Sequence, residues 1–187
     1  MQDPNHSYVI AIDVGIKNLG VCVFDFVSSK ICHWDNVSLV PHQGRYIPAN
    51  NVQYVRNLCE SLHHYFSNCV QLLVERQMRC NMRIIEAVLQ TMFFERCIII
   101  SARSVKMHYG LSTKNYRANK RIAVEWAGAF IRSNPGVFMD TVADRFLIGK
   151  QDDLADSLLL IMFYLNTYSN QLTDTDQCLN VQTSMTY

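Results

Sequence analysis

The sequence lacks several features that would assign a chain to a membrane or secreted class. Its longest nearly apolar stretch, residues 158–165, has eight residues, whereas a membrane-spanning helix needs about 20. Residues 1–7 contain no Lys or Arg, so we expect neither a signal peptide nor a transit peptide there. The seven cysteines are odd in number and form no Cys-x-x-Cys pair. We therefore expect reduced thiols in a cytosol-like compartment, no zinc site and no association with a membrane.

An excess of charge of one sign is also missing, because the net charge is only +1. The charges are nevertheless unevenly distributed. Residues 76–121 contain ten Lys or Arg and two Asp or Glu, while the rest of the chain contains seven basic and fourteen acidic residues. This distribution fits a positive face that binds a polyanion, and it fits equally well several solvated helix faces in succession.

The hydrophobic pattern predicts one folded α/β domain over residues 1–168. Apolar runs predict five strands and helical periodicity predicts four helices, while residues 101–116 are expected to be irregular. The strands are expected at 8–12, 19–26, 30–40, 70–74 and 97–100, and the helices at 52–66, 82–94, 117–132 and 151–168. The order predicts a single mixed five-stranded sheet, a meander of three strands plus two parallel strands, with helices on both faces. Residues 169–187 are polar and are expected to form a flexible tail.

The predicted helix 82–94 is apolar on nearly all sides of its axis. A helix of this kind must bury more than one face. Either a subunit interface or a position deep in the core would account for it.

Acidic residues occur where three buried elements begin or end. Asp13 follows the first strand and Glu75 follows the fourth, and parallel neighbours would bring both to the carboxyl edge of the sheet. Asp153 and Asp156 project from one side of the last helix, and Asp152 is also one turn from Asp156. Each residue alone has a structural explanation, as a turn, a strand end or a helix cap.

Taken together, these carboxylates indicate a cation site. Clustered carboxylates repel one another and are costly to desolvate unless a cation neutralises them. Oxygen ligands without His or Cys suit Mg²⁺ or Mn²⁺. Two such ions can activate water and stabilise the leaving oxygen in phosphodiester hydrolysis.

Three motifs carry a resemblance to a known family. They are Ile10-Ala-Ile-Asp-Val-Gly-Ile-Lys-Asn-Leu-Gly20, Leu73-Val-Glu-Arg-Gln77 and Lys150-x-Asp-Asp-x-Ala-Asp-Ser157. In this order they resemble the motifs of RuvC-type Holliday-junction resolvases, and most of all the poxvirus branch, which Tyr116-Arg-x-x-Lys-Arg121 also resembles. The resemblance extends from about residue 8 to residue 168. It implies a ribonuclease H-like fold, a homodimer with helix 82–94 as candidate interface, and Mg²⁺-dependent nicking of two symmetric strands of a four-way DNA junction.

The resemblance also assigns roles to individual residues. It implies that one or two Mg²⁺ ions, which Mn²⁺ can replace, are held by the catalytic residues Asp13, Glu75, Asp153 and Asp156. The family's spacing selects Asp153, whereas helix geometry alone does not exclude Asp152; we expect Asp152 and Lys150 beside the ligands. The residues expected to bind DNA phosphates are Lys120 and Arg121 first, then Lys114, Arg117, Arg76 and Arg79. Tyr109 and Tyr116 could stack on unpaired bases or simply pack.

The activity implied is junction resolution in DNA recombination and concatemer processing, leaving ligatable 5′-phosphate and 3′-hydroxyl nicks, at viral replication sites in the host cytoplasm. Two alternatives stay open: a nuclease of the same fold acting on RNA:DNA hybrids or structured RNA, and a non-catalytic junction-binding module. A phosphotransferase of the actin and hexokinase type, with its nucleotide cofactor, would need a second Asp-x-Gly loop and a second lobe, and the sequence has neither.

Overall fold

A single mixed β-sheet of five strands forms the centre of the fold. The computed structural model describes residues 6–41 and 44–182, with side chains as far as residue 168. The strands are β1 (Tyr8–Asp13), β2 (Leu19–Asp25), β3 (Lys30–Val37), β4 (Cys69–Glu75) and β5 (Cys97–Ile100), in the spatial order β3-β2-β1-β4-β5. The first three strands are an antiparallel meander, and β4 and β5 run parallel to β1. The predicted sheet is therefore confirmed, although its third strand, expected at 30–40, ends at Val37.

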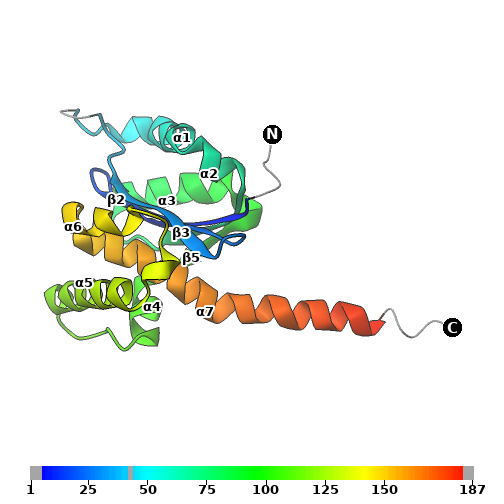
Figure 1. Cartoon of the computed structure of the whole chain (residues 1–187). Helices are drawn as coiled ribbons and strands as arrows, with labels where there is room; N and C mark the ends of the chain where they lie inside the picture. The colour runs from blue at the N-terminus through cyan, green and yellow to red at the C-terminus, as the bar shows by residue number, and fades with distance from the viewer. Residues whose placement is uncertain (1–5, 42–43, 183–187) are drawn as a thin grey trace.

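Helices cover both faces of this sheet, as the sequence predicts (Figure 1). On one face lie α1 (Asn51–Ser61), α2 (His63–Ser67) and α3 (Cys80–Met92). On the other lie α4 (Ala102–His108), α5 (Tyr116–Ser133), α6 (Arg145–Ile148) and α7 (Gln151–Gln182). Four short 3-10 helices, Pro48–Asn50, Phe94–Arg96, Pro135–Val137 and Val142–Asp144, complete the described elements.

The core is divided in two by the sheet because side chains alternate between its faces along each strand. Ile10 and Ile12 of β1 pack with Leu89 of α3 on one side. Val9 and Ala11 pack with α5 and α7 on the other. This alternation decides which face each strand-end residue joins.

The N-terminal end of α7 is attached to β3 by Trp34. Its indole Nε1 donates a hydrogen bond to the carbonyl oxygen of Leu154 at 3.0 Å. The indole ring stacks on Phe146 of α6 with 5.3 Å between ring centroids. Because Trp34 is fully buried, these contacts fix the first turn of α7 over the meander.

The structure corrects the predicted helices in several places. The helix expected at 52–66 divides at Leu62, and the stretch 101–116, expected to be irregular, contains α4. Because α4 is only seven residues long and buries Val105 alone, its sequence shows almost no apolar periodicity. The helix predicted to end at residue 168 continues to Gln182, because residues 169–182 contain no Gly or Pro to stop it.

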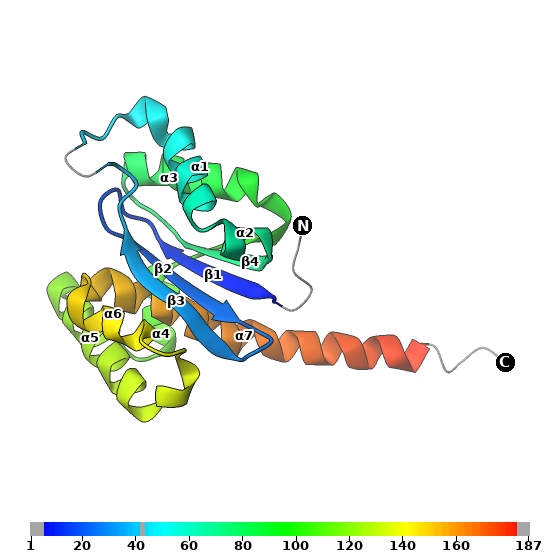
Figure 2. The ribbon, with the colours of Figure 1, turned by 45° about the horizontal axis from the view of Figure 1, so that its top comes forward.

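The C-terminal half of α7 extends beyond the sheet (Figure 2). The predicted flexibility of residues 169–187 stays a prediction, and residues 183–187 lie outside the described part. Within that part, no helix is both long enough and apolar enough to cross a membrane.

The helix predicted at 82–94 begins and ends two residues earlier, and it is not buried on all sides. Ile85 and Leu89 face the core, whereas Ile84 and Met92 are 41% and 45% exposed. The deep-core explanation of its apolar sequence is therefore wrong. A subunit interface is the explanation that stays open.

Candidate active site

Asp13 and Glu75 lie side by side at the carboxyl edge of the sheet. The last paired residues of the parallel strands β1 and β4 are Ile12 and Val74, and the two acids follow directly. By the alternation along each strand, Asp13 faces the same side as Ala11, and Glu75 the same side as Leu73. That is the face covered by α7.

The first turn of α7 brings Asp153 and Asp156 to the same place. Only 8% of Asp153 and 9% of Asp156 is exposed. The helix comes this close to β2 because residue 20 is Gly, where an added Cβ would lie 2.3 Å from the carbonyl oxygen of Asp153. On β3, the neighbouring Asn36 accepts a hydrogen bond from the backbone N–H of Lys150 at 2.6 Å. Gly20 and Asn36 face each other across the strand pair and together seat the helix.

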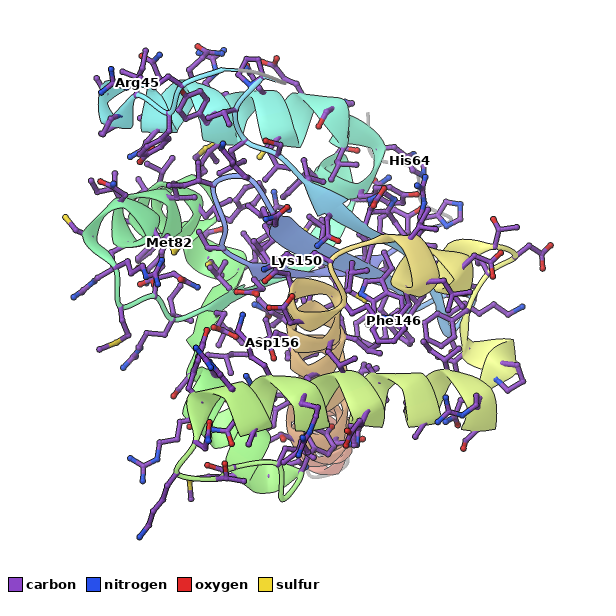
Figure 3. All side chains as sticks on the ribbon, turned by 90° about the vertical axis from the view of Figure 1, so that its left-hand side faces the viewer. Arg45, His64, Met82, Phe146, Lys150 and Asp156 are labelled. Atoms are coloured by element: carbon purple, nitrogen blue, oxygen red, sulfur yellow. The ribbon has the colours of Figure 1, made fainter. Side chains whose placement is uncertain are left out.

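A cavity of about 630 Å³ opens at this edge of the sheet, and all four acids line it. In Figure 3, Lys150 and Asp156 lie at the N-terminal end of α7, between the sheet and α5. The basic residues that line the cavity are Lys17, Arg76, Arg79, Lys106, Lys120 and Lys150. The predicted convergence of residues from three separate segments is therefore present in the structure.

Burial and mutual repulsion raise the pKa of the acids in the cavity. For Asp13, burial first, then Asp156 and Asp153, raise the pKa from 3.8 to about 8. Burial, followed by the charges of Asp13 and Asp156, raises the pKa of Glu75 well above its usual value. The pKa of Asp156 is raised by burial, against the lowering effect of Lys106. Four ionised carboxylates are thus unfavourable here without positive charge beside them.

Lysines supply part of that charge. The ammonium nitrogen of Lys150 lies 2.6 Å from Oδ2 of Asp153. That of Lys106 lies 3.0 Å from Oδ1 and 3.3 Å from Oδ2 of Asp156, and only the longer contact has hydrogen-bond geometry. Lys106 is a cavity residue that sequence reasoning missed, because it comes from α4, where the hydrophobic pattern predicts no helix.

The donor set fits a hard divalent cation in its chemistry. The cavity lining contains four carboxylates and no His or Cys, and Oδ1 of Asp156 is buried without a hydrogen bond. As the side chains stand, no three His, Cys, Asp or Glu residues in the described segments are grouped so that they could hold a metal ion. Since Asp153 and Asp156 are turned toward lysines, coordination would require these side chains to rotate.

The predicted phosphate-binding residues divide into two groups. Lys120, Arg76 and Arg79 line the cavity. Lys114 and Arg117 are exposed and do not line it, and Arg121 points to Glu125 one turn along α5, with 3.5 Å between Nε and Oε1.

The two candidate stacking tyrosines also differ. Tyr116 is 70% exposed and lines the cavity. Tyr109 packs against Trp126, with 5.0 Å between ring centroids, and its hydroxyl accepts a hydrogen bond from Asn166. Packing therefore accounts for Tyr109, and stacking stays open for Tyr116 alone.

A family model described as the poxvirus A22 protein matches residues 7–167. The chain belongs to this family. The predicted membership in the poxvirus branch is thereby confirmed. Among curated proteins, no sequence match to this A22 family member is found.

Solved structures similar to this A22 family member include three resolvases. The yeast mitochondrial Holliday junction resolvase Ydc2 has 21% identity over 86% of this chain and 79% of its own, with a TM-score of 0.64. The fowlpox virus resolvase, solved with Holliday junction DNA, has 18% identity over 86% and 97%, with a TM-score of 0.61. RuvC of T. thermophilus with its Holliday junction substrate has 16% identity over 87% and 97%, with a TM-score of 0.51. These likenesses confirm the predicted ribonuclease H-like fold.

Proposed function

We propose that this A22 family member is a structure-selective DNA endonuclease that resolves four-way junctions with the help of divalent cations. The observation that carries the proposal is the convergence of Asp13, Glu75, Asp153 and Asp156 in one cavity ringed by Lys and Arg. A polyanionic phosphodiester and a carboxylate-bound cation are the two ligands that such a cavity attracts. The similarity in fold to three Holliday junction resolvases gives further support.

In this proposal the four acids hold one or two Mg²⁺ ions, which Mn²⁺ can replace. When bound, the cation supplies Lewis-acid stabilisation and a water of lowered pKa. The charge of Asp13 acts on Glu75, and those of Asp156 and Asp153 act on Asp13, so Asp13 would be the ligand that two ions share. The geometry favours Asp153 over Asp152 as ligand, because Asp153 lines the cavity and Asp152 does not.

The lysines orient the DNA backbone in this scheme. Lys120 of α5 and Lys106 of α4 reach the cavity from the side opposite the sheet, and each carries an ammonium group that can contact a phosphate oxygen. Arg76 and Arg79, which follow Glu75, extend the positive surface along the cavity rim. We therefore place the scissile phosphate between these cations and the four acids.

The decisive test is incubation with labelled four-way junction, duplex and RNA:DNA hybrid in Mg²⁺, Mn²⁺ or EDTA. We expect paired symmetric nicks, ligatable because they carry 5′-phosphate and 3′-hydroxyl ends, only on branched DNA and only with metal. Asp13→Asn should abolish nicking but keep or strengthen junction binding, because it removes a ligand and a negative charge. Cutting of the hybrid would favour an RNA-directed nuclease, and binding without cutting would favour a non-catalytic module.

We further propose that the chain acts as a homodimer through α1 and α3. An apolar groove of about 890 Å³ lies between these helices, lined by Val52, Met78, Ile84, Val88 and Met92 among others. A four-way junction presents two equivalent phosphates, which a two-fold symmetric dimer can engage at once. Exposed apolar residues gathered in one groove are typical of such an interface.

Ile84→Asp tests the interface by analytical ultracentrifugation. We expect a monomer that still nicks one strand of the junction but no longer makes two symmetric nicks in the same junction. The matched control is Leu147→Asp on α6, because Leu147 is 78% exposed and lies outside the groove. A dimer that survives Ile84→Asp unchanged would contradict the assignment.

The activity would serve recombination and the processing of replicated DNA concatemers at viral replication sites in the host cytoplasm. The six cysteines whose side chains are described, Cys22, Cys32, Cys59, Cys69, Cys80 and Cys97, are free thiols, which supports a reducing compartment. Imaging of the tagged protein beside newly replicated DNA in infected cells tests this placement.

A further inference from the structure

Asp152 is the one acid at the start of α7 whose side chain does not face the cavity. Its neighbours Asp153 and Asp156 line the cavity, whereas Asp152 does not. Its carboxylate instead pairs with the ammonium groups of two lysines, Lys120 from α5 and Lys150 from the residues just before α7. A 22% exposed carboxylate with two cationic partners is already neutralised. It has no need of a metal ion.

The pair with Lys120 joins α5 to α7, and its two residues are 32 positions apart in the sequence. The lysine ammonium also lies above the ring of Tyr116, one turn earlier on α5, 5.4 Å from its centroid. Lys120 is therefore held from two sides, by a carboxylate on α7 and by an aromatic face on its own helix. The second partner of Asp152, Lys150, lies 3.4 Å from its Oδ1.

A free lysine side chain is flexible, and it loses rotamer freedom when it binds a phosphate. A contact that orders the side chain before the substrate arrives removes part of that loss from the binding step. Lys120 lines the cavity, so the ordered ammonium stands beside the acids. A contact that orders Lys120 therefore helps to fix the distance between the bound phosphate and the catalytic carboxylates.

We propose that Asp152 is a positioning residue that holds the Lys120 ammonium in the cavity, where it contacts the scissile phosphate. This role rests on the proposed nuclease function. It differs from ligation of a cation, because it acts through Lys120. It also differs from a contact that only joins the two helices, because loss of Asp152 is expected to change the nicking rate separately from the affinity for the junction.

The test is a double-mutant cycle with Asp152→Asn, Lys120→Ala and the double variant, in single-turnover nicking of a labelled four-way junction with Mg²⁺. Asp152→Asn should slow nicking by about tenfold to a hundredfold, the range for a displaced binding group. Junction affinity should change much less than the rate, because the loss of a negative charge near DNA opposes the loss of ordering in Lys120. Lys120→Ala should weaken binding and reduce its salt dependence. The double variant should nick no more slowly than Lys120→Ala alone.

Two controls separate this role from the others. Glu125→Gln removes an equally simple ion pair, with Arg121, from the exposed side of α5, and should leave the nicking rate unchanged. Asp152→Glu keeps the carboxylate and should recover part of the rate. Calorimetric titration with Mn²⁺ should give the wild-type affinity for Asp152→Asn and a weaker one for Asp153→Asn.

Four results would overturn the proposal. Loss of Mn²⁺ affinity in Asp152→Asn would make it a ligand, and losses in rate that multiply in the double variant would mean it acts independently of Lys120. Absence of coupling between the two residues in urea unfolding, measured without DNA or metal, would show that they do not interact. A wild-type protein that cuts no junction would overturn the proposed function and this role with it, while the unfolding cycle would still report on the contact.

Discussion

Replacing Gly20 by Ala tests whether the strand beneath α7 sets the position of the catalytic acids. A Cβ added at residue 20 would lie 2.3 Å from the carbonyl oxygen of Asp153 and 2.9 Å from its carbonyl carbon. Both atoms belong to the backbone of the first turn of α7, so no side-chain rotation can relieve the overlap. Either the turn or β2 must move by about 1 Å to reach ordinary van der Waals distance.

The expected cost has two parts. Overpacking of a well-packed site destabilises the fold by about 1–3 kcal/mol. A displacement of about 1 Å in a group that positions the reacting atoms reduces the rate by about a hundredfold. Because Asp153 and Asp156 move with the helix while Asp13 and Glu75 stay on the sheet, the metal affinity should fall as well.

The assay is urea unfolding combined with Mn²⁺ titration and single-turnover nicking. The matched control is Gly128→Ala on α5, where the new Cβ would meet only side-chain atoms, at 3.4 and 3.8 Å. Inside a helix this change should stabilise the protein by about 0.5–1 kcal/mol. If Gly20→Ala folded with wild-type stability and kept both metal affinity and rate, the close approach of β2 and α7 would not position the acids.

Three further predictions concern the same site. The pKa of Asp13 is raised from 3.8 to about 8, so between these values the folded state keeps a proton that the unfolded chain has lost. Stability in EDTA should therefore fall as pH rises, by at most about 1.4 kcal/mol per pH unit. Asp13→Asn should flatten this slope in urea unfolding at pH 5 and 8. Lys106→Met leaves the buried Asp156 carboxylate without its cation and should destabilise the protein by about 3 kcal/mol in EDTA, but by less in saturating Mg²⁺. Thermal unfolding with and without the metal measures both losses. Equal losses in the two conditions would contradict the pairing. Asn36→Ala removes the acceptor for the N–H of Lys150 and should cost about 1 kcal/mol, whereas Asn36→Asp should keep most of that stability.

The sheet and the acids could be predicted from sequence because each depends on a strong local signal. The buried run ending at Asp13 identifies a strand and its terminus together, and Glu75 repeats the arrangement. Parallel pairing of these strands then requires the two acids to be neighbours. The spacing of Asp153 and Asp156 fixes both to one side of a helix.

What could not be predicted depends on packing between distant segments. Lys106 enters the cavity from a seven-residue helix with a single buried residue, a signal too weak to detect. The separation of Asp152 from Asp153 depends on where α5 presents Lys120, which no local pattern encodes. The sequence predicts Arg121 beside Lys120 in the site, but one residue rotates a helix by about 100°, and Arg121 pairs with Glu125 instead.

Met78 lies three residues after Glu75 and belongs to the lining of both the apolar groove and the carboxylate cavity. Its side chain is 88% exposed, so its terminal methyl group is free to respond to either neighbour. Isotope labelling of the methionine methyl groups would make this single residue a spectroscopic probe of both the groove and the cavity. One resonance could then be followed while subunits associate and while nucleic acid is added, so that the order of the two events becomes measurable in one sample.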